Sequence, residues 1–421
     1  MKRCLRVFAP FVVIIALAGK WSATAPDAGE TRGLSLSPFV AGWSSHPSAT
    51  AASDGSIYGA WAQHTNPAEW EVSGIYVKRW TNGAWQSVGA RIGHRRGVDG
   101  AKWASAYAPS LAVVGTQPYI AWYEGGGYGW GEVQRTFVRS SVFVAHWDGS
   151  NWVLDRDNAV PNGALNTAPD AAARTPKLAV VAGVLHAAWI ETRGDRNVIV
   201  VKRLTAGQWT QAGSDVSSPP VGAGVIMIDV ALADVAGVPY VAWTEFRRAG
   251  DSASAPLRVV ALRGAAWTDV GGPLNTAAGA FANQLALAAS SGTLYVAWQE
   301  RALNGNNQVH VKVWKDMKWS ALGGPLNQDP DGGEAGAPAL ASLGSKVWLA
   351  WAEAPPGKRA ALRIRTLDGG GWSEAGPPLN VDPAGAADSP TLAASASTVS
   401  VVWVEKALPP ATKQVYAKEL H

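Results

Sequence analysis

Charged side chains are scarce in this sequence, since Asp, Glu, Lys and Arg make up 16% of its 421 residues against about a quarter in an ordinary soluble domain. Cysteine is scarcer still, because Cys4 is the only one. A chain with a single cysteine has neither an internal disulfide nor a cluster of thiolate ligands for a metal. Glycine and tryptophan are abundant instead, with 46 and 22 residues. This composition favours an all-β protein of short strands and tight turns.

Long apolar runs are also missing, except at the N-terminus. Residues 7–18 are apolar apart from Pro10, follow the basic Lys2, Arg3 and Arg6, and end in small residues at 16–18. This is the pattern of an export signal cleaved after Ala18, and its 12 residues are fewer than the ~20 that a membrane-spanning helix needs. We expect a signal peptide at residues 1–18, one domain at 19–421, and a secreted or periplasmic protein. An uncleaved membrane anchor is the alternative.

The basic character of the chain depends on this leader. Removing residues 1–18 takes away three lysine and arginine residues and no acidic ones, which lowers the formal net charge from +4 to +1. A nearly neutral chain has no general attraction for nucleic acid. We therefore expect neither a nucleic-acid partner nor a membrane span after cleavage.

An apolar segment ending in Ala-Trp-x-Glu, or a close variant, repeats along the chain. Its seven copies lie at 59–63, 120–124, 187–191, 241–245, 296–300, 349–353 and 401–405. Each follows a shorter apolar segment and a turn of two to four residues, and precedes a third segment with period-two alternation, such as 75–80 or 309–314. A fourth segment opens with tryptophan in six units, at Trp85, Trp152, Trp209, Trp267, Trp319 and Trp372. The repeat predicts a seven-bladed β-propeller of four-stranded antiparallel blades.

The seventh unit stops after its third segment. Lys20-Trp21-Ser22-Ala23 repeats Lys318-Trp319-Ser320-Ala321 of the fifth unit. We therefore expect an N-terminal strand at residues 20–23 to supply the outer strand of the last blade, which would close the ring and leave no open sheet edge.

Seventeen tryptophans recur with the repeat and are expected to pack the blades. Of the other five, Trp348 lies in a strand segment and is expected in the core, whereas Trp43, Trp70, Trp103 and Trp130 lie in long segments of units one and two. These long connections all project from one face of the predicted propeller. Variation concentrated on one face of a repeat protein indicates its binding face.

The same long segments carry further polar and aromatic residues. The candidate ligand-binding residues are Trp43, Trp70, Arg95, Arg96, Trp103, Tyr107, Tyr128, Trp130, Glu132 and Arg135. Aromatic faces combined with arginines and carboxylates suit a sugar, because the ring stacks on its C–H face while the charged groups bond its hydroxyls. The alternative is that these long loops only pack on one another.

The glutamate of the repeated motif needs a separate interpretation. A residue that recurs around a ring favours a structural role, such as holding a neighbouring loop. Unit one departs from the rule, because it has Gln63 followed by His64. A local break in a structural rule is either a functional position or sequence drift.

Signatures of catalysis are weak. Asp329-Pro330-Asp331-Gly332-Gly333-Glu334 resembles half of a calcium loop but lacks the remaining ligands, and we expect no metal and no cofactor. A carboxylate pair for glycoside hydrolysis could be drawn from Glu69, Glu71, Glu124 and Glu132, whose separation the sequence does not provide.

Over residues 20–420 the repeat resembles those of secreted bacterial β-propellers, including sialidase-like and lectin-like ones. Sialidases carry a Ser-x-Asp-x-Gly-x-x-Trp turn between the third and fourth strands. This chain has Trp147-Asp148-Gly149-Ser150-Asn151-Trp152 there, which lacks the serine and changes the spacing, so sialidase activity is not implied.

Three functions remain open. The favoured one is a non-enzymatic recognition propeller that binds a carbohydrate or another cell-surface ligand on the loop-rich face of blades one and two. The second is a glycan-processing hydrolase or lyase that uses the same face. The third is an extracellular or envelope scaffold that binds a protein partner. Fold alone does not choose among them.

Overall fold

A computed structural model describes residues 34–36, 43–64, 73–81, 83–93, 105–125, 140–157, 160, 162–194, 196–216, 225–249, 252–302, 305–406 and 413–420. All of them belong to the second of the chain's two units, residues 32–421. Every regular element among them is a β-strand. None of the described segments is a helix long and apolar enough to cross a membrane.

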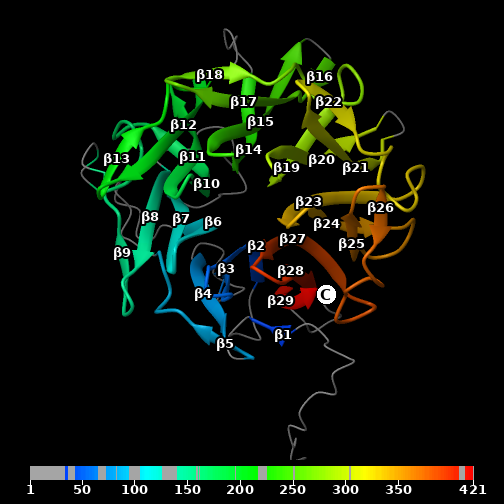
Figure 1. The fold of residues 1–421 in the computed structure, drawn as a ribbon, viewed down its shortest axis with the longest axis horizontal. Helices are drawn as coiled ribbons and strands as arrows, with labels where there is room; N and C mark the ends of the chain where they lie inside the picture. Colours follow the sequence, from blue (N-terminus) through cyan, green and yellow to red (C-terminus); the bar gives the residue numbers. More distant parts are fainter. Residues whose placement is uncertain are drawn as a thin grey trace, which may run out of the picture. The chain divides into compact units, whose positions relative to one another are not determined.

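Seven antiparallel sheets form the blades of a β-propeller and follow one another around a ring in chain order (Figure 1). Blades 1 to 3 consist of β2 (Trp43–Ala51), β3 (Ile57–His64), β4 (Ser73–Thr81) and β5 (Ala84–Ser87); β6 (Ser105–Val114), β7 (Gln117–Gly125), β8 (Ser141–Trp147) and β9 (Trp152–Leu154); and β10 (Ala172–Val181), β11 (Val184–Arg193), β12 (Arg196–Thr205) and β13 (Gln208–Gln211).

Blades 4 to 6 follow the same plan. They consist of β14 (Val225–Val235), β15 (Val238–Ala249), β17 (Leu257–Arg263) and β18 (Ala266–Asp269); β19 (Phe281–Ser290), β20 (Thr293–Arg301), β21 (Asn307–Lys315) and β22 (Lys318–Ala321); and β23 (Glu334–Leu343), β24 (Lys346–Ala354), β25 (Ala361–Leu367) and β26 (Trp372–Glu374). Blade 4 also has a short additional strand, β16 (Ser252–Ser254), which pairs with the end of β15. The predicted fold class is confirmed.

Blade 7 is closed by a strand from the N-terminal part of the chain. Its order is β1 (Leu34–Ser35), β29 (Lys413–Leu420), β28 (Val399–Lys406) and β27 (Ala386–Ala394). Closure by an N-terminal strand is therefore confirmed, but the described strand is Leu34–Ser35, and residues 20–23 lie outside the described part. The amide of Leu36 donates to the carbonyl of Val415 at 2.7 Å, as Leu326 does to Val309 at 2.9 Å in blade 5. Leu36 thus takes the place of the leucine that precedes asparagine in other units. The repeat of Trp-Ser-Ala at residues 21–23 does not by itself identify this leucine.

The core lies between neighbouring blades. The tryptophans of the repeated motif, such as Trp61 and Trp298, are buried and include the largest fully buried side chains. The tryptophans that open the outer strands join one blade to the previous one through their indole N–H groups. Trp152 donates to the carbonyl of Val88 at 2.9 Å, and Trp372 donates to that of Leu322 at 3.0 Å. The recurring tryptophans of the described strands are therefore packing residues, as predicted, and Trp348 is buried as well.

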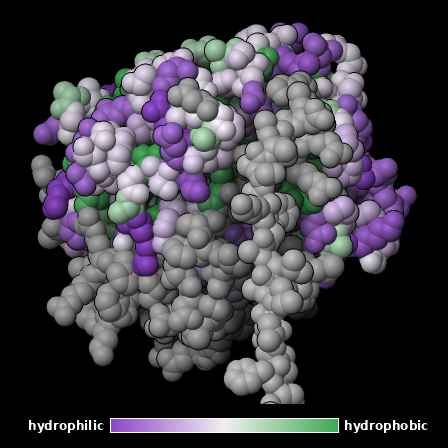
Figure 2. All heavy atoms as spheres, turned by 90° about the horizontal axis from the view of Figure 1, so that it is seen from below, coloured by the Kyte–Doolittle hydropathy of each residue, from purple (hydrophilic) through white to green (hydrophobic). Residues whose placement is uncertain are grey.

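The surface is largely polar. Figure 2 shows one side of the molecule, where hydrophilic and weakly polar residues cover most of the described surface and hydrophobic ones show mainly in recesses. Among the described residues, the exposed large hydrophobic side chains are Trp43, Val153, Ile226 and Met317. Single exposed apolar residues are common, but Trp43 lies beside another ring, that of His64.

Candidate aromatic site on blades 1 and 2

The glutamate of the repeated motif has a structural role. Glu300 is buried and accepts hydrogen bonds from the indole N–H of Trp298 at 2.8 Å and from the backbone N–H of Thr276 at 3.0 Å. Glu191, Glu353 and Glu405 make the same two kinds of bond. Each carboxylate thus fastens the connection that enters its own blade to the buried tryptophan. The structural interpretation of this residue is confirmed.

Gln63 fills the same position in blade 1 with a different set of bonds. Its side-chain oxygen accepts from the Ser44 hydroxyl at 2.7 Å and from the Trp61 indole at 3.2 Å, and its amide donates to the carbonyl of His64 at 3.2 Å. A carboxylate could not donate to that carbonyl. The side chain of Gln63 therefore holds the backbone of His64, whose ring contacts two other aromatic rings.

Four ring side chains form what we call the aromatic row: Trp43, His64, Tyr107 and Tyr123. Trp43 pairs with His64 across β2 and β3, and their ring centroids are 6.1 Å apart. His64 then contacts Tyr107 of the next blade at 6.3 Å, and Tyr107 pairs with Tyr123 at 5.5 Å. Trp43 is the exposed end, whereas the other three rings are half-buried.

The row lies at the predicted binding face. Trp43 begins β2, His64 ends β3, and Tyr107 and Tyr123 lie near the corresponding ends of β6 and β7. In the sequence, residues 65–72 follow β3, residues 94–104 precede β6, and residues 126–139 follow β7. Of the ten candidate residues, the structure therefore brings together Trp43 and Tyr107, with Trp43 at the start of a strand rather than within a loop. The other eight, Trp70, Arg95, Arg96, Trp103, Tyr128, Trp130, Glu132 and Arg135, lie outside the described residues.

His64 and Tyr123 were not among those candidates. A signal for them was present, because both stand next to the glutamine or glutamate of the repeated motif in units one and two. Their proximity to Tyr107 depends on how blades 1 and 2 pack, which the spacing within one unit does not reveal.

Burial favours the neutral form of two histidines at this face, His64 and His46. Burial lowers the pKa of His64, so its imidazole is mostly neutral at pH 7. His46, at the bulge of β2, also has a lowered pKa, because burial and then the positive charge of Lys177 disfavour its protonated form. Asp388 opposes this effect and Lys413 adds to it. His46 therefore lies within electrostatic range of His64, Lys177, Lys413 and Asp388.

Other motifs prove to be turns. Asp329 accepts from the backbone N–H of Gly332 at 3.0 Å, and no three His, Cys, Asp or Glu side chains group as metal ligands among the described residues. Asp148 accepts from the backbone N–H groups of Ser150 and Asn151 at 2.7 and 2.6 Å. Of the four carboxylates considered for hydrolysis, only Glu124 is described. It is buried and accepts from the Trp122 indole at 2.8 Å, which assigns it the structural role.

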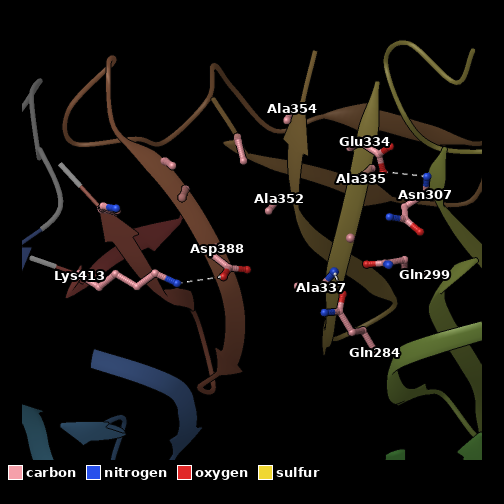
Figure 3. A pocket seen from close by; sticks show the side chains of 15 residues that line it. Gln284, Gln299, Asn307, Glu334, Ala335, Ala337, Ala352, Ala354, Asp388 and Lys413 are labelled. Carbon is pink, nitrogen blue, oxygen red and sulfur yellow. Dashed lines mark hydrogen bonds and ion pairs between the residues drawn. The ribbon is translucent and has the colours of Figure 1, made fainter. Parts of the chain in front are cut away.

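A cavity of about 330 Å³ lies between blades 5, 6 and 7 (Figure 3). It opens at the ends of β20, β24 and β28 and at the starts of β23, β27 and β29, which is the same face of the ring as the aromatic row. The sequence did not indicate it, since alanines supply nearly half of its lining.

Comparison with known proteins shows the fold. No protein-family model matches the chain, and no curated protein matches it. The polysaccharide lyase Uly1 is 9% identical, with a TM-score of 0.58 over 95% of this chain and 94% of that one. A protein of unknown function from Dyadobacter fermentans is 11% identical, with a TM-score of 0.52 over 93% and 98% of the two chains.

A sialidase from Trypanosoma rangeli, solved with sialic acid, is 10% identical, with a TM-score of 0.50 over 92% of this chain and 57% of its own longer one. The chain is thus a β-propeller whose structural neighbours include glycan-processing enzymes.

Proposed function

We propose that this protein binds a polysaccharide along the aromatic row and processes it there. The observation that carries the proposal is a histidine imidazole held between an exposed tryptophan and a tyrosine. The exposed Trp43 ring offers an apolar surface to the C–H face of a sugar. The fold likeness to a polysaccharide lyase and to a sialidase is consistent with glycan processing and does not define the substrate.

Elimination fits the described residues better than hydrolysis. In elimination from a uronic acid residue, a base takes the proton at C5, the C4–C5 double bond forms, the C4–O bond breaks, and the leaving oxygen takes a proton. Neutral His64 suits the base, and the phenol of Tyr107 suits the acid. Lys177, which acts on the charge of His46, would offset the carboxylate of the sugar. Hydrolysis would need a carboxylate pair, and Glu124 is committed elsewhere.

The test is incubation of the protein with uronate-containing and neutral polysaccharides. Cleavage is followed by new reducing ends, and elimination is followed by the ultraviolet absorbance of the unsaturated product. His64→Ala and Tyr107→Phe are expected to abolish product formation. Tyr119→Phe is the matched control, because Tyr119 lies at the opposite end of β7 and bonds only to Gln117 in the described structure. Reducing ends without ultraviolet absorbance would indicate hydrolysis and refute the elimination chemistry.

Recognition without turnover is the second candidate, and the exposed ring of Trp43 supports it by itself. It predicts that the wild type binds glycans without releasing product, and that Trp43→Ala loses the binding. Absence of binding to any glycan would refute both candidates and favour a protein-binding scaffold.

The expected signal at residues 1–18 would bring the protein to the periplasm or the medium, where polysaccharides are available. Cell fractionation tests that location.

A further inference from the structure

The cavity between blades 5, 6 and 7, called here the blade 5–7 pocket, results from two small residues facing each other. Gly336 pairs with Ala352 across β23 and β24. In blade 2 the corresponding cross-strand pair is Tyr107 with Tyr123. Blade 2 thus carries two tyrosine rings at a position where blade 6 carries no side chain larger than a methyl group.

Glycine at one wall of the pocket makes room for a side chain of the neighbouring blade. A Cβ atom on Gly336 would collide with the side-chain oxygen of Gln299, so the Gln299 amide lies directly over that residue. No described residue hydrogen-bonds the Gln299 side chain. Asn283 pairs with Gln299 across β19 and β20, and its buried side-chain oxygen also has no hydrogen-bond partner in the described structure. Because Gln299 lines the cavity, its amide is available to a polar ligand.

The remaining polar groups converge from two sides, as Figure 3 shows. On one side, the oxygen of the Gln284 side chain accepts from the backbone N–H of Ala337 at 2.7 Å, which leaves its amide N–H groups for a ligand. On the other side, Lys413 and Asp388 form an ion pair at 3.7 Å, with 41% and 50% of their side chains exposed. An exposed pair of this length contributes little in water, so a ligand can replace either partner at low cost.

The lining defines the chemistry of the occupant. Two lysines, Lys406 and Lys413, balance the carboxylates of Glu334 and Asp388, so the pocket favours an uncharged ligand. The floor consists of alanine methyl groups, including those of Ala352 and Ala354. The volume is at the small end of the ~300–1,000 Å³ typical of ligand pockets, which suits one sugar ring.

We propose that the blade 5–7 pocket binds one neutral sugar residue bearing an acetamido group. The acetamido methyl packs on the alanine floor, and its amide pairs reciprocally with the Gln299 amide. Asp388 and Lys413 then bond ring hydroxyls. This site lies on other blades than the aromatic row and does not depend on the activity proposed there.

The experiment measures binding of N-acetylglucosamine, N-acetylgalactosamine, glucose and galactose to the full chain, by saturation-transfer NMR and calorimetry. Ala352→Tyr fills the pocket with the residue type that blade 2 carries at this place. Gln299→Leu removes the amide at similar size. Gln208→Leu is the matched control, because Gln208 is exposed on the outer strand β13. Thermal unfolding establishes that each variant is folded.

We expect an acetamido sugar to bind, and Ala352→Tyr and Gln299→Leu each to raise its dissociation constant at least about tenfold, or ~1.4 kcal/mol. Gln208→Leu and Trp43→Ala should leave that constant unchanged. If Ala352→Tyr fails to fold, Gln299→Leu decides alone. The proposal is overturned if neither acetamido sugar binds, if glucose or galactose binds equally well, or if the Gln299→Leu variant binds like the wild type. Loss of binding in Trp43→Ala alone would move the sugar to the aromatic row.

Discussion

Replacing the buried Glu300 by alanine should destabilise the protein strongly. The carboxylate accepts from the Trp298 indole, the Thr276 amide and the Thr276 hydroxyl, and Glu300 is 1% exposed. Removing it leaves three donors without an acceptor, each costing roughly 1–3 kcal/mol. Partial access of water to the Thr276 segment offsets part of this cost. We expect the free energy of unfolding to fall by about 3–5 kcal/mol.

Urea unfolding followed by tryptophan fluorescence measures the loss, with the denaturant slope checked for constancy. Glu374→Ala is the control, because Glu374 is 44% exposed and pairs with Arg365 at the surface; such a pair contributes up to about 1 kcal/mol. Glu300→Gln should fall between the two, since Gln63 shows that an amide is accepted at this position. If Glu300→Ala costs no more than Glu374→Ala, the carboxylate does not hold the incoming connection and the reasoning fails.

Three further predictions concern the site and the blade contacts. Trp43→Ala should weaken glycan binding about tenfold by removing the stacking surface; unchanged affinity in a glycan titration would exclude this ring. The rate of glycan processing should fall when His64 becomes protonated at low pH. Because the pKa of His64 is lowered, the acidic midpoint of the pH–rate profile should lie below 6.5. A midpoint at or above 6.5 would argue against His64 as the base. Trp319→Phe removes the indole bond to the Val270 carbonyl and should lower the unfolding free energy by about 1 kcal/mol, whereas an unchanged urea midpoint would show that packing alone joins these blades.

The fold was predictable because its signal is repeated seven times. The buried tryptophan and the glutamate two residues later bond to each other in six blades, so each copy of the motif reports the same local contact. Closure of the last blade by an N-terminal strand was predicted, whereas the described strand Leu34–Ser35 was not, because a two-residue strand followed by Leu36 carries almost no sequence pattern.

The sites were less predictable for a physical reason. Tyr107 and Trp43 were recognisable in the sequence as aromatic residues that do not recur with the repeat. They are linked through the ring of His64, and the contact between His64 and Tyr107 forms only when blades 1 and 2 pack together. The blade 5–7 pocket arises because Gly336 and Ala352 have no large side chains, whereas two tyrosines face each other at the corresponding positions of blade 2. Predicting such a cavity requires knowledge of the strand register in two blades, because the absence of a side chain produces no recognisable sequence motif.

Pairing of β1 with β29 has a consequence for the timing of folding. Leu34 lies opposite Ala417, so this contact joins nearly the two ends of the propeller. During synthesis, blades 1 to 6 can pair their strands locally as they emerge, whereas blade 7 lacks its third strand until Lys413–Leu420 have been added. Contacts of such long range form slowly. An interrupted chain would therefore keep an unpaired sheet edge, the feature that promotes aggregation and exposes a protein to proteolysis.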